Sequence, residues 1–326
     1  MAKYLTKRVL RGILTIFLSV TFTFFLLRLM PSDPVQMLID PKMSDETVAQ
    51  LYEQYGLDQP LIVQYFNYLG QLLQGNMGTS FSHKNTPVTE VLMSALPWTL
   101  LLMVISVTLS LVIGIPVGMR AAKKHGKAFD RGVNVIMMIG ISIFIPFLAF
   151  GLLYLFGFKL AWLPTGKMYD IAARRAGGLE YVLNVAQHAI LPALTLTISN
   201  CTTIILYTRN SMLDVQKEDY IRTAMAKGWD DRYVTRKHAM KNAMIPTITA
   251  TGIMIASMVG GAIMTESIYS WQGVGYEIYT SVSSLDYPVL QGAFLILSAV
   301  TVVMNIITDL VLAWIDPRVK LGGAKA

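Results

Sequence analysis

The stretch from residue 91 to residue 119, VLMSALPWTLLLMVISVTLSLVIGIPVGM, contains no Lys, Arg, Asp or Glu. About 20 helical residues cross the roughly 30 Å of hydrocarbon in a bilayer, so this stretch can span a membrane. Similar uncharged stretches occupy residues 12–27, 132–158, 181–208, 242–265 and 287–308. The sequence therefore predicts an all-α fold, a polytopic membrane bundle of six transmembrane helices.

Composition supports a membrane protein. The chain is 54% hydrophobic and only 14% charged, with a mean hydropathy of +0.51, which is more apolar and less charged than a typical soluble domain. The first apolar stretch follows Lys3, Lys7, Arg8 and Arg11, as in a signal peptide. It is longer than an ordinary signal core and no small-residue cleavage site follows it, so we interpret it as a retained helix.

The distribution of basic residues predicts the topology. With six spans and a cytoplasmic amino terminus, most of the 27 Lys and Arg residues fall in the segments on the cytoplasmic side. We therefore expect both termini in the cytoplasm and the chain in the cytoplasmic membrane of a prokaryote, in contact with membrane lipid. The net charge of +7 is then a topology signal, and it does not indicate a nucleic-acid partner.

The spans divide the chain into four regions: a cytoplasmic amino terminus with the first helix (1–30), an extracytoplasmic segment (31–98), a five-helix core (99–314) and a cytoplasmic tail (315–326). The extracytoplasmic segment predicts two short helices. Ser44 is a suitable N-cap for the first, which Gly56 can end. The second can begin at Pro60 and stop at Gly75.

The cytoplasmic loop 209–245 lies inside the core region and predicts two further short helices. The first covers residues 218–227 and ends at Gly228. The second covers residues 232–245, and Pro246 closes it. A short helix with alanine and glycine on one side can enter a partner's groove and transmit motion to the spans at its ends. The alternative is an ordinary solvated basic loop.

The residues of this loop resemble a known family. Tyr220-Ile-Arg-Thr-Ala-Met-Ala-Lys-Gly228, followed by His238-Ala-Met-Lys-Asn-Ala-Met-Ile-Pro246, resembles the EAA loop of ATP-binding-cassette (ABC) importer permeases in their dipeptide, oligopeptide and nickel branch. Arg222-Thr223-Ala224 stand where Glu-Ala-Ala is the general pattern. The further motifs that agree in order are Met30-Pro31-Ser-Asp-Pro34, Tyr55-Gly-Leu-Asp-Gln-Pro60, Gly75-Asn-Met-Gly-Thr-Ser80, Gly114-Ile-Pro-Val-Gly118, Trp271-Gln-Gly-Val-Gly275, Asp286-Tyr-Pro-Val-Leu-Gln-Gly292 and Asp316-Pro-Arg318.

The resemblance implies a MetI-like fold and the B-type permease of a binding-protein-dependent system. Such a chain pairs with a homologous second permease and two ATP-binding subunits, and it receives substrate from an extracytoplasmic binding protein. Peptides are the implied substrate, with a nickel or other metal chelate or an oligosaccharide as the alternatives. The implied coupling helix comprises Tyr220, Ile221, Arg222, Thr223, Ala224, Ala226, Lys227 and Gly228.

The chain shows no site for catalysis or nucleotide. Gly126-Lys127 is followed by Ala128, and Gly166-Lys167 by Met168, so neither has the spacing of a phosphate-binding loop. We therefore expect no enzyme activity and no cofactor in this chain, with ATP and Mg²⁺ bound by the partner subunits. The four histidines lie in different segments without metal-ligand spacing, and we expect no metal site.

Some residues within or beside the spans are candidates for a pore or gate, because ionisable groups and paired glycines inside a membrane often have functional roles. They are Gly260, Gly261, Glu266, Asp309 and His188. We expect Glu266 to lie at the outer end of its helix, near interfacial rings of Tyr269 and Trp271, where it can attract a substrate ammonium group. The alternative for Asp309 is a structural ion pair with a basic residue near the inner interface.

Two other classes of protein were weighed against the permease interpretation. A stand-alone secondary transporter or channel calls for internal repeats, ion-binding carboxylates in mid-membrane or a charged selectivity ring. The sequence shows little of these. A membrane receptor or assembly factor would use the long extracytoplasmic segment as its ligand site.

Overall fold

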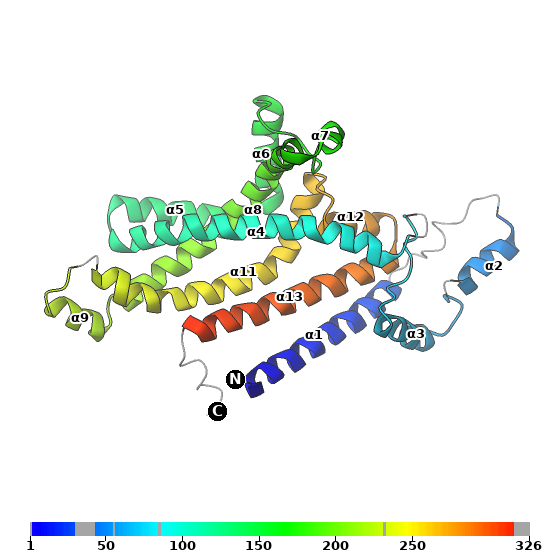
Figure 1. Cartoon of the computed structure of the whole chain (residues 1–326), viewed down its shortest axis with the longest axis horizontal. Helices are drawn as coiled ribbons and strands as arrows, with labels where there is room; N and C mark the ends of the chain where they lie inside the picture. Colours follow the sequence, from blue (N-terminus) through cyan, green and yellow to red (C-terminus); the bar gives the residue numbers. More distant parts are fainter. Residues whose placement is uncertain (1, 30–42, 55, 84–85, 231–232, 316–326) are drawn as a thin grey trace. The chain divides into compact units, whose positions relative to one another are not determined.

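The structure is a computed structural model, and it describes residues 2–29, 43–54, 56–83, 86–230 and 233–315. The chain is 81% helical, and no strand occurs in the described residues. The elements are α1 (Ala2–Arg28), α2 (Asp45–Gln54), α3 (Leu61–Leu73), α4 (Val88–Lys123), α5 (Ala128–Ser142), α6 (Ile145–Leu152), the π-helical turn η2 (Leu153–Lys159), α7 (Ile171–Ala176), α8 (Gly178–Val215), α9 (Asp219–Ala226), the π-helical turn η3 (Val234–Ala239), α11 (Met240–Ile268), α12 (Val274–Ser283) and α13 (Tyr287–Ile315) (Figure 1).

Four helices are long and apolar enough to cross a membrane without a break: Thr6–Arg28, Val88–Lys123, Gly178–Val215 and Tyr287–Trp314. Two further spans are bent. Ala128–Ser142 and Ile145–Lys159 meet at 102°, and Lys237–Met258 and Ala262–Ile268 meet at 50°. The predicted six spans are therefore present as four continuous helices and two bent pairs.

The contacts divide the chain into two compact units, which we describe separately. The first, called the core unit here, comprises Met1–Val9, Leu100–Trp271 and Val303–Ala326. The second, called the outer unit, comprises Leu10–Thr99 and Gln272–Val302. The names follow the sequence regions that each unit mainly contains.

Helix α8 is the centre of the core unit, and small residues let two helices approach it closely. A Cβ added to Gly118 of α4 would lie 2.9 Å from the carbonyl oxygen of Ile205, and one added to Gly114 would lie 2.7 Å from the Ile204 side chain. A Cβ on Gly140 of α5 would collide with Thr202. Glycine thus permits close helix packing at these three positions.

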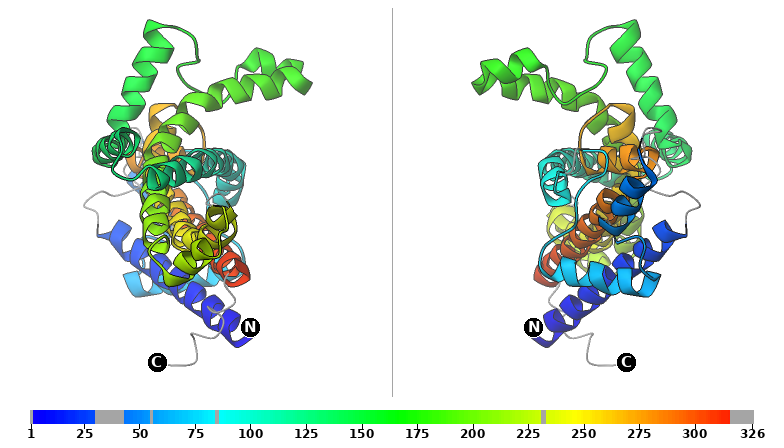
Figure 2. Two further views of the ribbon diagram at one scale, coloured as in Figure 1. Left: turned by 90° about the vertical axis from the view of Figure 1, so that its left-hand side faces the viewer. Right: turned by 90° about the vertical axis from the view of Figure 1, so that its right-hand side faces the viewer.

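The third span bends because the helix stops and restarts. Ile143 and Phe144 adopt extended backbone angles, and Pro146 lies in the first turn of α6, a position where its missing N–H costs nothing. Figure 2 shows from both sides how α6 and η2 turn away from α5. The Tyr269 hydroxyl fixes this arm of the core unit, because it donates to the Ala149 carbonyl at 3.0 Å and shares a 3.0 Å hydrogen bond with Thr195.

The outer unit contains both short helices predicted for the extracytoplasmic segment. The backbone N–H of Thr47 donates to the Ser44 hydroxyl at 3.3 Å, so Ser44 caps α2 as expected. Helix α3 begins directly after Pro60 and lies beside the end of α1 in Figure 1, where Tyr65 shares a 2.7 Å hydrogen bond with Thr21. Gly75 ends the turn after α3 with a φ of +78°, a conformation that favours glycine.

One local prediction was wrong. Pro246 does not close a separate helix, because η3 continues directly into α11 and Pro246 lies inside α11. A proline removes one hydrogen bond of the helix, and apolar helices that pack on neighbours tolerate this loss. The start of the predicted helix 232–245, the motif Met30–Pro34 and the tail from Asp316 lie outside the described residues.

Candidate coupling site

The predicted coupling helix is present as α9, and one of its faces is buried within the core unit. Ile221 is 1% exposed and Ala224 is 5% exposed, whereas Tyr220, Arg222, Thr223, Ala226, Lys227 and Gly228 are exposed. Gly228 has a φ of +80°, which confirms its predicted role as the residue that ends the helix. The segment is thus a short helix with one packed face and one exposed face.

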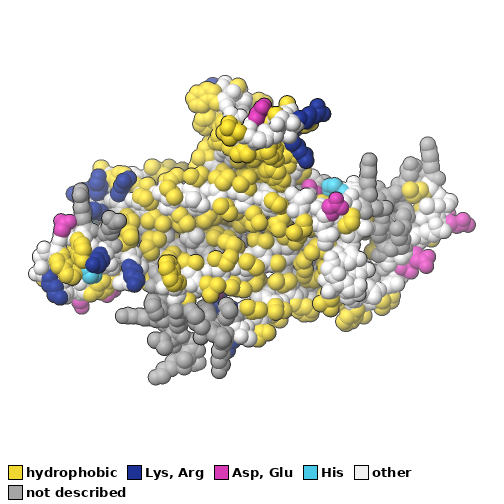
Figure 3. Space-filling view, in the orientation of Figure 1, with side chains coloured by type: hydrophobic (Ala, Val, Ile, Leu, Met, Phe, Trp, Pro, Cys, Tyr) yellow, Lys and Arg dark blue, Asp and Glu magenta, His cyan; other side chains and the backbone are white. Residues whose placement is uncertain are grey.

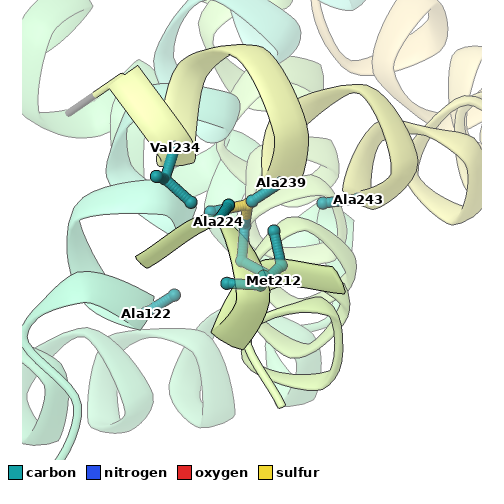
Figure 4. Packing of buried hydrophobic residues seen from close by; sticks show 7 residues of the cluster. Ala122, Met212, Ala224, Val234, Ala239 and Ala243 are labelled. Carbon is teal, nitrogen blue, oxygen red and sulfur yellow. The ribbon is translucent and has the colours of Figure 1, made fainter. Parts of the chain in front are cut away.

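The buried face of α9 belongs to an apolar cluster that joins several helix ends. Ile221 and Ala224 pack with Ala122 of α4, Met212 of α8, Val234 and Ala239 of η3, and Ala243 of α11. Figure 4 shows these side chains converging between the ribbons of the four elements around α9. Alanine predominates, so the backbones approach closely and a displacement of α9 must move its neighbours with it.

Two side-chain contacts lie near the start of α9, and they differ in strength. At its start, the Asn242 side chain of α11 donates a 2.7 Å hydrogen bond to the Tyr220 hydroxyl. The Arg222 side chain contacts Asp219 at 3.6 Å, but both are largely exposed, so this pair contributes little. The opposite face of α9 carries Arg222, Thr223 and Ala226. These three residues are exposed and do not belong to the apolar cluster.

A buried ion pair lies at the same end of the core unit, and we did not predict it from the sequence. Arg209 of α8 donates to both carboxylate oxygens of Asp130 of α5, at 2.6 and 2.9 Å. The Gly126 backbone N–H donates to Asp130 at 3.0 Å, and the His125 ring lies 3.1 Å away. Asp130 is 2% exposed and Arg209 9%. The pairing thus saturates a buried carboxylate and fixes α5 against α8.

Signals for the pair existed in the sequence. Asp130 comes four residues after Gly126 and lies in the first turn of α5, where an acidic residue is stabilising. Arg209 was counted as the first residue of the cytoplasmic loop, but α8 continues past it to Val215. A charge inside a helix that is apolar up to that point was therefore the available clue.

The glycine candidates lie where the fifth span changes direction. Gly260 and Gly261 belong to α11, and the segments Lys237–Met258 and Ala262–Ile268 that flank them differ in direction by 50°. Glu266, in contrast, does not face a vestibule in this structure, because it is 0% exposed within the core unit. Tyr269 and Trp271 are likewise buried, at 1% and 0% exposed, so their rings pack inside the protein.

The other two candidates make structural contacts in the core unit. Asp309 forms a 2.8 Å ion pair with Arg8, a basic residue near the start of the chain, which is the structural alternative that the sequence left open. His188 is buried in α8, and its Nδ1 lies 2.8 Å from the Asn184 carbonyl oxygen. The structure thus does not bring the pore candidates together into one site.

In the outer unit, two of the sequence motifs meet although they are far apart in the chain. The Ser80 hydroxyl donates to Asp286 at 2.5 Å, and Ser82 donates to the same oxygen from its hydroxyl at 2.7 Å and its backbone N–H at 3.0 Å. Nearby, Glu277 of α12 lies 3.6 Å from the ring of His83. Burial raises the pKa of Glu277, His83 opposes this change and Asp286 reinforces it.

The surface of the core unit separates charge from apolar area. On the face that Figure 3 shows, hydrophobic side chains cover the helices, and Lys and Arg gather around α9 and the turn between α4 and α5. Exposed apolar side chains such as Val104, Val112, Ile136 and Ile253 are what lipid or another apolar helix would cover. Among the described residues, no group of three or more His, Cys, Asp or Glu could hold a metal ion.

Comparison with protein families accounts for this architecture. Residues 114–321 match the family described as the binding-protein-dependent transport system inner membrane component. Residues 1–112 match the amino-terminal region of the same membrane component. The chain belongs to this family. The permease is therefore a multi-pass membrane protein, and permease subunits of this family are not catalytic.

Curated relatives match the permease over almost its whole length. It is 39% identical over 324 residues to the oligopeptide transport system permease protein AppB of Bacillus subtilis, which covers 98% of this chain and 100% of the relative. It is 36% identical over 317 residues to the probable D,D-dipeptide transport system permease protein DdpB of Escherichia coli, with 93% of each chain covered.

A solved structure confirms the fold. The permease is similar to a chain in a structure of inward-facing conformations of the MetNI methionine ABC transporter, with a TM-score of 0.57 and 17% identity. The match covers 69% of the permease and 96% of that chain. The predicted MetI-like fold is thus confirmed over the part of the permease that the match covers.

Proposed function

We propose that the permease forms half of the pore of an ABC importer for di- and oligopeptides. Relatives that carry peptide or dipeptide transport in their names, and that align end to end with this chain, support the substrate class. The pore is completed by a homologous second permease, and an extracytoplasmic binding protein delivers the peptide. Both termini and α9 face the cytoplasm, which agrees with the basic residues around α9.

The observation that carries the mechanism is the two-sided character of α9. One face is fixed by Ile221 and Ala224 to the ends of α4, α8 and α11, and the other face, with Arg222, Thr223 and Ala226, is exposed. A helix with this arrangement can sit in the groove of an ATP-binding subunit and pass its movement to three spans at once. The sequence had indicated only the two spans that flank the loop.

The ATP-binding partner subunits supply the energy for transport. Two ATP-binding subunits hold ATP and Mg²⁺, and their closure and reopening displace α9 and with it the packed helix ends. The 50° change of direction in α11 around Gly260 and Gly261 lies in a span that begins next to α9. We propose these glycines as the place where that span changes shape during the cycle, because glycines allow backbone changes at little steric cost.

The coupling role can be tested by filling the exposed face of α9. Ala226→Trp adds a large ring on the side that does not pack inside the permease. In proteoliposomes with the second permease, both ATP-binding subunits and the binding protein, we expect at least a tenfold loss of peptide uptake and of peptide-stimulated ATP hydrolysis. The thermal unfolding of the complex should remain unchanged.

A matched control lies just before α9. Lys217 is exposed and pairs only with Asp214, also exposed, so Lys217→Trp adds the same ring beside the coupling face. It should retain uptake. Normal coupled uptake by the Ala226→Trp complex would show that this face does not contact the ATP-binding subunits. Uptake by the permease alone, without the other subunits, would contradict the importer assignment as a whole.

A further inference from the structure

The outer unit contains a cavity of about 370 Å³ that has no part in coupling. It lies between the end of α1, helix α3, the segment after α3 and the start of α13, all within this unit. Small-molecule sites in proteins have volumes of about 300–1,000 Å³, so the cavity can hold a small ligand.

The cavity is lined by Arg28, and among the described residues no carboxylate compensates its charge. Arg28 donates from Nε to the Gln64 side chain at 3.0 Å, and its guanidinium lies over the rings of Phe24, at 4.9 Å, and Tyr287, at 5.9 Å. Among the described residues, no Asp or Glu forms an ion pair with Arg28. The neighbours hold this side chain in place but leave its outer N–H groups available to an acceptor.

A second donor lines the same cavity. Gln291 of α13 is 7% exposed, and its side-chain nitrogen is buried without a hydrogen-bond partner among the described residues. A buried donor without an acceptor is unfavourable, and a bound acceptor would remove this cost. Tyr68 also lines the cavity, and burial raises the pKa of its hydroxyl, which therefore keeps its proton and can donate.

The rest of the lining suits a peptide. Gln59, Asn67, Gln71 and Asn76 contribute amide side chains, a group that can both donate and accept, as a peptide group does. Asn67 donates to the Gln59 side-chain oxygen and Asn76 accepts from the Gly78 N–H, which leaves the remaining amide atoms of these side chains for a ligand. Among the described residues of the lining, Glu53 is the one carboxylate and Arg28 the one cation. A wall with a single charge of each sign and many amides complements a zwitterion with internal peptide groups better than it complements a polyanion.

We propose that this cavity is an outer subsite for short peptides, in which Arg28 and Gln291 bind the terminal carboxylate and Glu53 binds the terminal ammonium group. This inference rests on the proposed peptide function. Recognition through the termini and the peptide groups would not involve the side chains of the bound peptide, so the subsite would accept peptides of varied sequence. A phospholipid headgroup, which also carries an anion, is treated as an outcome of the test.

The test is equilibrium binding to the complete importer complex in nanodiscs, without the binding protein. The probes are trialanine, trialanine amide and N-acetyl-trialanine. We expect trialanine to bind, and the amide, which lacks the carboxylate, to bind at least tenfold more weakly. Arg28→Gln should reduce trialanine binding to the level of the amide, whereas Arg175→Gln, at an exposed arginine of the core unit, should have no effect.

A second variant covers the case in which Arg28→Gln does not fold. Gln291→Glu has nearly the same shape and places a carboxylate in the cavity, where it would occupy Arg28 and repel the peptide carboxylate. We expect it to abolish the preference for trialanine over its amide. Thermal unfolding of each complex shows whether the variant is folded.

Three results would overturn the subsite: no binding of trialanine, equal binding of trialanine and its amide, or loss of a bound phospholipid from the Arg28→Gln complex in native mass spectrometry without peptide binding. Uptake that depends on the binding protein is measured in parallel. Normal peptide uptake with no peptide in the cavity would reject the subsite and leave the proposed function standing.

Discussion

Two buried or largely buried carboxylates, one in each unit, are partnered in opposite ways. Asp130 in the core unit accepts two hydrogen bonds from the Arg209 guanidinium and a third from a backbone N–H. Glu277 in the outer unit has one oxygen that is buried without a hydrogen bond among the described residues, and this oxygen lies 3.6 Å from the His83 ring.

The difference indicates what each region is built to do. A saturated ion pair beside an alanine cluster makes a rigid end, where movement of α9 is passed on to several helices. A largely buried carboxylate without full partners leaves a polar group available for a change of charge or a ligand. The following predictions test this contrast in order of expected effect.

The largest effect is expected from breaking the Asp130–Arg209 pair. Asp130→Asn leaves the Arg209 guanidinium buried without a counter-charge, and removal of one partner of a buried pair typically costs about 3–5 kcal/mol. We expect a pronounced fall in the midpoint of thermal unfolding of the purified permease. The matched control is Asp214→Asn, because Asp214 pairs with Lys217 in solvent, where the expected cost is below about 1 kcal/mol.

A double variant shows whether the pair or its burial matters. In Asp130→Leu with Arg209→Met, apolar groups of similar volume replace both charges, and such replacements are often neutral or stabilising. The double variant should therefore unfold at a higher temperature than Asp130→Asn. Equal unfolding temperatures for Asp130→Asn and Asp214→Asn would show that the contact does not stabilise this end of the core unit.

A medium effect is expected from the glycines that set helix distance. Gly118→Ala places a methyl group 2.9 Å from the Ile205 carbonyl oxygen, and the Ile205 backbone cannot move without moving α8. Overpacking of this kind costs about 1–3 kcal/mol. In the outer unit, Gly70 of α3 has no atom within 4 Å of an added Cβ, so Gly70→Ala should be neutral or stabilise by up to about 1 kcal/mol.

Unfolding of both variants under the same conditions measures the contrast between tight and open packing. If Gly118→Ala is as stable as Gly70→Ala, α4 is not held against α8 by this contact.

Much of the fold followed from local patterns in the sequence. Uncharged stretches predicted the spans, and caps such as Ser44 and Gly228 predicted the ends of short helices, because these signals act over a few residues. The bends in the third and fifth spans could not be predicted from local patterns. Whether Pro146 and Pro246 break or continue a helix depends on what packs around them, and the first begins a new helix while the second lies inside one.

The site was predictable only in part for the same reason. The resemblance located α9, but the sequence did not reveal that Ile221 and Ala224 face inward, since that depends on Ala122 and Met212 from other helices. The Asp130–Arg209 pair and the contact of Ser80 with Asp286 join residues that are far apart in the chain. Such contacts are set by tertiary packing, which no local pattern encodes.

The smallest effect is expected at Glu277, where it should depend on pH. Burial raises the pKa of Glu277 above its ordinary value, which Asp286 reinforces and His83 opposes. Because the folded state favours the protonated form, the stabilisation is full below the ordinary pKa and is lost as the pH rises through the raised pKa. Glu277→Gln, which mimics the protonated form, should therefore unfold at a higher temperature than the wild type near pH 8 and at a similar temperature near pH 4.

Asp286→Asn serves as the contrast. Asp286 accepts hydrogen bonds from Ser80 and Ser82 that an amide only partly accepts, so this variant should be destabilised near pH 8. A constant difference in unfolding temperature between wild type and Glu277→Gln across this pH range would mean that Glu277 keeps its charge throughout, as Asp130 is expected to do. The contrast between the two carboxylates would then be one of packing alone.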